Sequence, residues 1–315
     1  MTIHIVSLPN RPLLVIAGPT AIGKTRIAIE LAKELNGEII SADSRQIYKG
    51  MDIGTAKPSK DEQAAARHHM LNVVNPDGHF SVGEYKRSAE KIIEDIWQRN
   101  RLPIIAGGTG LYIRAVIDGL WEGPKADNEL RDKLKKEEEA FGKGCLYKKL
   151  KEIDPETAEK TKPNDLVRII RSLEVYYKEG KPISYFHRAH GFEEKKYNAV
   201  IIGLTMDRKM LYKRIEERVD KMINSGLVDE VKALLKKGYD ENIISMTGVG
   251  YRQVIGYLRG DYNLEEAVRL IKRDTKRYAK RQYTWFNQDK RIEWFNADDI
   301  DMQGLASGIK KRLKL

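Results

Sequence analysis

Short runs of consecutive apolar residues alternate along this chain with stretches in which apolar residues recur every three or four positions. Residues 13–17 and 102–106 are apolar runs bounded by glycine or polar residues, a pattern typical of buried parallel strands. Residues 24–35 and 81–100 show helical spacing, and Ser81 begins a capping-box pattern with the glutamate three positions later. The alternation predicts an α/β fold in which helices flank a parallel sheet.

Two further apolar runs, at residues 38–42 and 199–204, predict more strands of the same sheet. Between them, residues 123–198 are densely charged and show mainly helical spacing. We therefore expect residues 1–122 and 199–315 to form one core, with residues 123–198 as a helical insertion domain and a basic helical region toward the C-terminus.

Composition narrows the class of protein. The chain has 315 residues, 41% of them hydrophobic, which is enough for a packed core. Its net charge of +11 favours a polyanionic partner such as nucleic acid without requiring one. The single cysteine, Cys145, excludes an internal disulfide and a cysteine-rich zinc site. No signal peptide is visible and no apolar run approaches the roughly 18 residues of a membrane span. We expect a soluble, cytoplasmic monomer with no membrane partner.

The strongest chemical motif follows the first predicted strand. Residues 18–25 read GPTAIGKT, the G-x-x-x-x-G-K-T pattern of a P-loop, and they lie between a strand and a helix as that motif requires. The glycines let successive backbone N–H groups turn toward one anion, and the helix N-terminus adds partial positive charge. We expect the lysine to reach the terminal phosphate and the final threonine hydroxyl to help hold Mg²⁺. The candidate phosphate-binding residues are Gly18, Pro19, Thr20, Ala21, Ile22, Gly23, Lys24 and Thr25.

The acid that P-loop NTPases usually place at the end of an apolar strand is missing from one expected position. The run at 102–106 ends in Gly-Gly-Thr-Gly, with Thr109 as its polar residue, whereas Asp43 ends the run at 38–42. We expect the glycine turn to let the backbone and Thr109 approach a ligand closely. An aspartate at this point can simply cap a loop, but it also lies where binding crevices form in such sheets. The phosphate site therefore does not require ATP hydrolysis, and a diphosphate leaving group is an alternative ligand.

Cations recur at spacings of three and four near the C-terminus, so on a helix they cover one face, while Tyr278 and Trp285 fall among the apolar residues of the other side. A solvated surface is one reading. However, little acid lies among them, so they would repel each other, and a bound polyanion is the better interpretation. The cations are Arg269, Lys272, Arg273, Lys276, Arg277, Lys280 and Arg281.

Other charged residues are ambiguous from spacing alone. Arg208 follows the strand at 199–204 and either clamps phosphate or is a surface charge at a helix start. Arg168 and Arg171 lie three residues apart and either face a ligand together or form a solvated pair. His68 and His69 are adjacent and lack a nearby acid cluster, so we do not expect a metal site there.

Taken together, seven segments in order resemble the tRNA dimethylallyltransferases, also called tRNA isopentenyltransferases. The resemblance covers nearly the whole chain, whereas a P-loop alone marks a very large class. Small departures are Ile22 and Lys276, where the family often has Ser and Arg, and the chain ends without the zinc-finger-like extension of eukaryotic relatives, which implies the bacterial type. The segments are GPTAIGKT (18–25), SADSRQIYKGMDIGTAKP (41–58), AGGTGLY (106–112), NDLVRIIRSLEV (164–175), MDR (206–208), GVGYRQ (248–253) and TKRYAKRQYTWF (275–286).

The resemblance implies a P-loop NTPase-like fold and a reaction. Dimethylallyl diphosphate would be held by the P-loop, Arg208 and Mg²⁺, and the exocyclic 6-amino group of the adenosine on the 3′ side of the anticodon would attack the allyl carbon. Asp43 would act as general base, worth roughly 10²–10⁴ in rate. Thr109 would bond the bridging oxygen of the departing diphosphate, where charge develops.

The resemblance also implies a set of residues for the anticodon stem-loop, whose unpaired bases can be read and flipped. Besides Asp43, it comprises Ser44, Arg45, Gln46, Arg131, Val167, Arg168, Ile169, Ile170, Arg171, Gly248, Gly250, Tyr251, Arg252, Gln253, Lys276, Arg277, Lys280 and Arg281.

Two alternatives stay open at this point. A small-molecule kinase would use ATP in the same P-loop, which explains the first 120 residues but not the basic helix or the insertion. A non-catalytic RNA-binding protein explains the charge but not an intact Gly-Lys-Thr beside Asp43 and Thr109.

Overall fold

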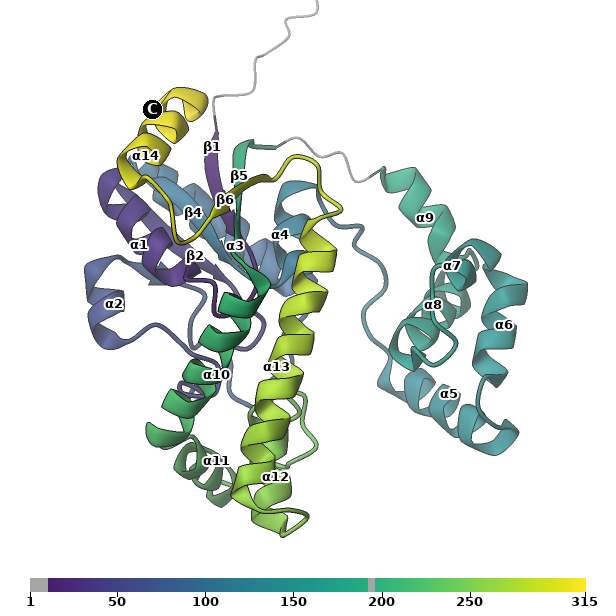
Figure 1. The fold of residues 1–315 in the computed structure, drawn as a ribbon. Coiled ribbons are helices and arrows are strands. Elements are labelled where there is room, and N and C mark those ends of the chain that lie inside the picture. Colours follow the sequence, from purple (N-terminus) through teal and green to yellow (C-terminus); the bar gives the residue numbers. More distant parts are fainter. Residues whose placement is uncertain (1–10, 192–195) are drawn as a thin grey trace, which may run out of the picture. The chain divides into compact units, whose positions relative to one another are not determined.

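A computed structural model describes residues 11–191 and 196–315 of the chain (Figure 1). Its described residues fall into two compact units, one within residues 1–117 and 195–315 and one within 118–194. The limits predicted for the insertion from the sequence are 123 and 198.

One sheet organises the larger unit, and all its strand pairs are parallel in the order β3-β2-β4-β1-β5-β6. The prediction of a parallel sheet flanked by helices is therefore confirmed. The strands are β1 (Pro12–Ala17), β2 (Gly37–Ala42), β3 (His68–His69), β4 (Leu102–Gly107), β5 (Asn198–Thr205) and β6 (Glu293–Asn296).

Alternating side chains of β1 pack into two separate apolar clusters, one on each face of the sheet. Leu14 and Ile16 join the cluster under α1 and α14, whereas Leu13 and Val15 join the cluster under α3 and α4. Both faces are covered, which explains why the strands read as continuous apolar runs. The covering helices are α1 (Lys24–Glu34), α3 (Val82–Gln98), α4 (Gly110–Ile117) and α14 (Met302–Leu313).

Helices α10 (Arg208–Asn224), α11 (Leu227–Lys236), α12 (Tyr251–Arg259) and α13 (Leu264–Phe286) extend beyond the carboxyl ends of the strands (Figure 1). They share a third apolar cluster that includes Val231 and Ile271, and the long α13 lies beside α10. The short α2 (Lys60–Ala65) packs against α1.

The smaller unit is entirely helical in its described residues and has its own apolar cluster, centred on Leu146, Leu150 and Leu173. Its helices are α5 (Asn128–Phe141), α6 (Cys145–Ile153), α7 (Pro155–Glu159), α8 (Leu166–Glu179) and α9 (Ile183–His190).

Predicted element limits agree with the structure to within about two residues, and the capping box of Ser81 and Glu84 is confirmed at the start of α3. The strand β6 and the helix α14 were not predicted from the sequence. Within the two described segments, no helix has both the length and the apolar character to cross a membrane.

Candidate active site and nucleic-acid interface

Three neighbouring strands end at the same level and bring the predicted catalytic segments together. Gly107, the last residue of β4, pairs with Ala17 at the end of β1 and with Ala42 at the end of β2. The residues that follow these strand ends are the P-loop, Asp43 and Thr109. The parallel register therefore places all three at one edge of the sheet, where ligands bind in such folds.

The P-loop has the backbone conformation that its glycines predict. Gly18 and Gly23 have φ values of 150° and 100°, and Gly23 is the N-cap of α1. Gly18 also lies against β5, because a Cβ there would be 3.0 Å from the carbonyl oxygen of Leu204. Ile22, which departs from the family pattern, is fully buried in the apolar cluster under α1, so its larger side chain is accommodated.

Lys24 is held within the loop and is electrostatically perturbed. Its ammonium donates to the carbonyl oxygen of Pro19 at 2.7 Å. Burial lowers the pKa of Lys24 to about 7, nearby Asp43 opposes this shift, and the cation of Arg218 on α10 adds to it. The site therefore has an unsatisfied preference for negative charge, which a diphosphate would meet.

Asp43 and Thr109 belong to one hydrogen-bond network. Asp43 Oδ1 accepts from the backbone N–H of Arg45 at 2.8 Å, so the aspartate shapes its own turn. The N–H of Ser44, one residue earlier, donates to Thr109 Oγ1 at 3.0 Å. The backbone N–H of Thr109 donates in turn to the carbonyl oxygen of Ala42 at 3.0 Å. The two predicted catalytic groups are thus fixed relative to each other.

The glycines around Thr109 have a different cause from the one that the sequence suggested. The Gly-Gly-Thr-Gly turn was interpreted as room for a ligand, but protein atoms fill that room. A Cβ at Gly108 would lie 2.1 Å from Gln282 Nε2, and one at Gly110 would lie 2.1 Å from the Trp285 ring. Both neighbours come from α13, so the glycines allow this helix to pack against the turn.

This edge also contains three residues, Gln282, Tyr278 and Arg218, that the sequence patterns did not assign to the site. The side-chain amide of Gln282 contacts both the P-loop and the turn before Thr109. Burial, with Asp43 nearby, raises the pKa of Tyr278 to about 12, and Thr109 interacts with the same hydroxyl. Burial lowers the pKa of the Arg218 guanidinium, and the charge of Asp43 opposes that shift. Helical periodicity assigned Tyr278 to the apolar side of its helix, and nothing local in the sequence singles out Gln282 or Arg218.

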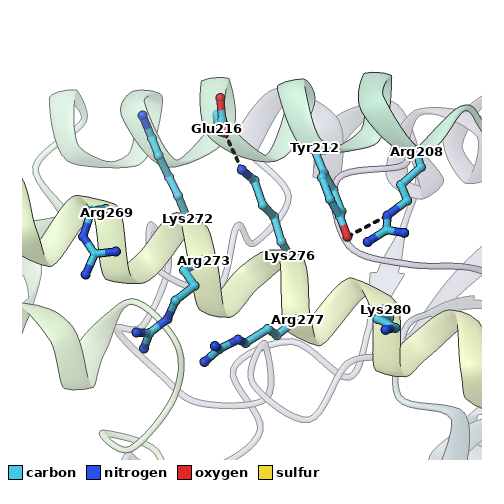
Figure 2. Close-up of a pocket in the computed structure, with 9 residues that line it drawn as sticks. All are labelled: Arg208, Tyr212, Glu216, Arg269, Lys272, Arg273, Lys276, Arg277 and Lys280. Carbon is cyan, nitrogen blue, oxygen red and sulfur yellow. Dashed lines mark hydrogen bonds and ion pairs between the residues drawn. The ribbon is translucent and has the colours of Figure 1, made fainter.

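Among the described residues, Arg208 makes no hydrogen bond or ion pair with the P-loop; it lies instead at one end of a basic groove between α10 and α13 (Figure 2). It is exposed and donates to the hydroxyl of Tyr212 at 3.0 Å. The groove has a volume of about 450 Å³, and one carboxylate, Glu216, lines it. Its other residues are Arg208, Tyr212, Arg269, Lys272, Arg273, Lys276, Arg277 and Lys280.

Most of these cations have acidic partners, so the expectation that they repel one another is wrong. Two lysines pair with α10: Lys276 with Glu216, and Lys272 with Asp220 at 2.7 Å. Asp274 of α13 pairs with Arg273 at 2.9 Å and with Arg277 at 3.5 Å. Spacing along α13 does not reveal the acids that α10 brings beside it.

The segment 244–253 packs against the turn that follows Asp43. The guanidinium of Arg45 donates to the carbonyl oxygen of Ile244 at 2.5 Å, and Gly248 lies beneath it. Gln46 is also held internally, since its amide oxygen accepts from Ser41 at 2.9 Å and its amide nitrogen donates to Ala56 at 3.2 Å. These contacts give the predicted RNA-reading segment 44–46 a fixed shape.

Two predicted RNA contacts of the same region are buried. Tyr251 donates to Glu230 at 2.7 Å, and its ring leaves no room for a Cβ at Gly54. Gln253 accepts from the N–H of Gly250 at 2.9 Å and donates to Asp274. Their side chains therefore support the loop, and the exposed residue of this motif is Arg252.

The predicted RNA-binding arginines of the helical unit are engaged with a buried acid. Arg131 forms two hydrogen bonds, at 2.8 and 2.9 Å, with the fully buried Glu174, and Arg171 donates to the same carboxylate at 2.5 Å. Arg131 therefore joins α5 to α8, whereas Arg171 bonds to a glutamate of its own helix and to the carbonyl oxygen of Pro124.

The start of α8 offers a different surface. Val167 is 82% exposed, unusual for an apolar side chain, and Arg168 is exposed beside it. Ile169 and Ile170 are buried in the core of the unit. Of the predicted RNA-contacting segment 167–171, Val167 and Arg168 therefore face outward.

The adjacent histidines have structural partners. His69 Nε2 lies 2.7 Å from Glu38 Oε2, and His68 Nδ1 lies 2.8 Å from the carbonyl oxygen of Ala66. Over residues 11–191 and 196–315, no group of three or more His, Cys, Asp or Glu side chains is placed to hold a metal ion.

Comparison with known proteins agrees with this geometry. The model of the IPP transferase family matches residues 46–289. The tRNA dimethylallyltransferases of Halothermothrix orenii and Acetivibrio thermocellus are 51% and 50% identical to this chain. The alignments cover 96% and 92% of it and 92% and 93% of those proteins.

Solved structures are similar over the same length. A tRNA isopentenylpyrophosphate transferase from Bacillus halodurans has a TM-score of 0.72 at 40% identity, covering 96% of this chain and 97% of its own. A eukaryotic dimethylallyltransferase acting on tRNA has a TM-score of 0.76 at 28% identity, covering 96% of this chain and 77% of its own. The P-loop-like sheet, its helical unit and these matches together show that this chain belongs to the IPP transferase family.

Proposed function

We propose that this protein transfers the dimethylallyl group of dimethylallyl diphosphate to the exocyclic 6-amino group of the adenosine 3′ to the anticodon in tRNA. The observation that supports it best is the edge of the sheet, where the register of β1, β4 and β2 assembles the P-loop, Thr109 and Asp43. We also propose that the protein is a monomer and acts in the cytoplasm.

The P-loop would bind the diphosphate of the donor. Backbone N–H groups at the start of α1 provide donors and partial positive charge, and Lys24 would neutralise an oxygen of the terminal phosphate. Because burial holds the pKa of Lys24 near 7, the dianionic or trianionic ligand would restore its proton. The exposed Arg208 would have to leave Tyr212 to reach the same ligand.

The residues at this edge fit Mg²⁺ bound with the donor. Mg²⁺ commonly uses one or two protein oxygens together with phosphate oxygens and water, so it does not need a cluster of acids. The hydroxyl of Thr25, at the first turn of α1, is the oxygen ligand that we assign. When bound, the ion would neutralise charge on the departing diphosphate.

Asp43 would accept the proton of the attacking amine. A bond forms between the 6-amino nitrogen and the first allyl carbon while the bond from that carbon to the diphosphate oxygen breaks. The amine proton passes to the carboxylate, and diphosphate leaves with the bonding electrons. Since Oδ1 of Asp43 accepts from Arg45 N–H, we assign the proton to the other oxygen.

Thr109 would stabilise the leaving group. Its hydroxyl oxygen accepts from Ser44 N–H at 3.0 Å, and its proton faces the hydroxyls of Ser44, 3.5 Å away, and of Tyr278. With the donor bound, that proton would turn to the bridging oxygen, on which negative charge develops.

The basic groove beside α10 would bind backbone phosphates of the anticodon stem-loop. Except for Arg208, its cations lie on α13, the helix that packs against the Thr109 turn, so RNA bound there would lie near the catalytic edge. In the helical unit, the outward-facing Val167 and Arg168 are the residues of the 164–175 motif that we assign to the same RNA.

The proposal is tested by transfer of labelled dimethylallyl from its diphosphate to an unmodified anticodon stem-loop. Label should enter the RNA, and RNA with inosine at the target position, which lacks the 6-amino group, should stay unlabelled. Thermal shift provides the second measurement, and dimethylallyl diphosphate should stabilise the protein more than ATP does. No label in adenosine-containing RNA, together with stronger stabilisation by ATP, would favour a kinase instead.

A further inference from the structure

One side chain of α13 connects two loops that are far apart in the sequence. The side-chain oxygen of Gln282 accepts from the backbone N–H of Thr20, in the P-loop, at 2.9 Å. Its side-chain nitrogen donates to the carbonyl oxygen of Gly108, directly before Thr109, at 2.9 Å. Gln282 is 6% exposed. Both polar ends of the amide are therefore satisfied inside the protein.

The surroundings show that this contact is built into the fold. Gly108 has no side chain to displace the amide, since a Cβ there would lie 2.1 Å from Gln282 Nε2. Tyr278 and Trp285 lie four residues before and three residues after Gln282 and face the same turn, so one stripe of α13 covers this edge. A shorter side chain at 282 could not reach both loops.

We propose that Gln282 is a positioning residue that preorganises the P-loop for the diphosphate donor. This inference rests on the proposed function. The bond to Gly108 orients the amide so that its oxygen faces Thr20, and the bond to Thr20 holds one loop N–H away from the anion. The loop is thereby curled before any ligand arrives, and the remaining N–H groups point toward the anion without a further ordering cost.

Loss of this amide should weaken binding of the donor more than it slows transfer from the bound donor. Preorganisation stabilises the loop equally for substrate and transition state, so it lowers the KM and leaves kcat nearly unchanged. Each hydrogen bond is worth a factor of about 2–12 in an equilibrium, and two such bonds are involved. We expect the KM for dimethylallyl diphosphate to rise about tenfold, with kcat within about threefold of the parent.

The test compares Gln282→Met and Gln282→Glu with the matched control Gln288→Met, which makes the same change at an exposed position just beyond α13. The first readout is the Kd of inorganic diphosphate with Mg²⁺, measured by calorimetry. The second is amide hydrogen exchange in residues 18–23, which reports the Thr20 N–H directly. The third is the separate KM and kcat of transfer.

The Met variant should raise the Kd about tenfold and speed exchange at Thr20, and the control should match the parent. The Glu variant should bind diphosphate at least as weakly as the Met variant, because an ionised carboxylate cannot donate to Gly108 and repels the anion. A Met variant with lower thermal stability but an unchanged Kd and unchanged exchange in 18–23 would overturn the inference. If the parent binds diphosphate but transfers nothing, the proposed function fails while the Gln282 result stands.

Discussion

Two carboxylates at opposite ends of the same strand have contrasting surroundings. Glu38, near the start of β2, is fully buried and accepts from Arg99 and His69, with Arg67 and Arg101 close by. Burial alone would raise the pKa of Glu38, but the hydrogen bonds of Arg99 and His69 lower it to about 2.

Asp43 follows the end of that strand, is partly exposed and accepts from one backbone N–H. Because several cationic side chains surround Glu38, its carboxylate is held in one position and stabilises the fold. The spare oxygen at Asp43 leaves it able to accept a proton. On the proposed mechanism, the number of partners, rather than burial alone, separates a structural carboxylate from a catalytic one.

Asp43→Asn tests the reactive end of the strand. The amide preserves the size of the side chain and can still accept from Arg45 N–H, but it cannot take a proton, so kcat should fall at least about a hundredfold. Single-turnover transfer of labelled dimethylallyl measures this, and the thermal midpoint should stay within a few degrees of the parent. Full activity in the variant would remove the base role from Asp43.

Glu38→Gln tests the structural end. It leaves the guanidinium of Arg99 without its buried counter-charge, so stability should fall by about 3 kcal/mol. Chemical denaturation measures this loss, with Glu94→Gln as an exposed control that should change little. The diphosphate affinity of the folded fraction should not change, and a selective loss of affinity would contradict the division between the two ends.

The low pKa of Glu38 also predicts that the stability of the fold depends on pH. Because the folded pKa of Glu38 is about 2, below its ordinary value, its ionised form stabilises the fold above roughly pH 4.5. That contribution should disappear as the pH falls from about 4.5 to 2. Denaturation of the parent and of Glu38→Gln across this range should show curves that converge at low pH.

Lys24 extends the comparison to a cation at the reactive end. Since its folded pKa is about 7, below the unfolded value of 10.5, the free protein should gain stability as the pH rises between these values. Lys24→Met should abolish this gain and add on the order of 1 kcal/mol at pH 7, roughly 2 °C in Tm. Diphosphate binding should take up protons in the parent near pH 8, and calorimetry in buffers of different ionisation enthalpy would detect this.

Glu216→Gln should give the smallest effect, at the basic groove. The change releases Lys276 from its partner, so affinity for the anticodon stem-loop should rise about twofold to fivefold and the salt dependence should steepen. Lys276→Gln should do the reverse. Equal salt slopes in both variants would place the RNA outside this groove.

The sequence predicted those parts of the site whose conformation depends on residues adjacent in the chain. The P-loop, the strand before it and Asp43 could be predicted because a local motif fixes their conformation and parallel strands end at one edge. Gln282 could not, because its contacts join residues 262 and 174 positions away. For the same reason, the sequence suggested a ligand beside Gly108 and Gly110, whereas their neighbours are Gln282 and Trp285.

Charge was the other weak point of the sequence. A periodic row of cations on α13 suggested mutual repulsion, but the partners of Lys272 and Lys276 come from α10, about 50 to 60 positions away in the chain. Arg131 of α5 likewise bonds to Glu174 of α8, 43 positions away, in the core of the helical unit, whereas Arg171 bonds to the same carboxylate from within α8. Packing between helices, which periodicity does not describe, decided all of these cases except that of Arg171.

The paired cations of the groove have a consequence for selectivity. The carboxylates of Glu216 and Asp220 act as built-in competitors, and an incoming anion must displace them before it gains those lysines. A loosely fitting polymer such as heparin replaces one weak pairing with another and gains little. On the proposed function, an RNA whose phosphates match the groove along its whole length would displace several partners at once, so Glu216 and Asp220 would favour it over other polyanions.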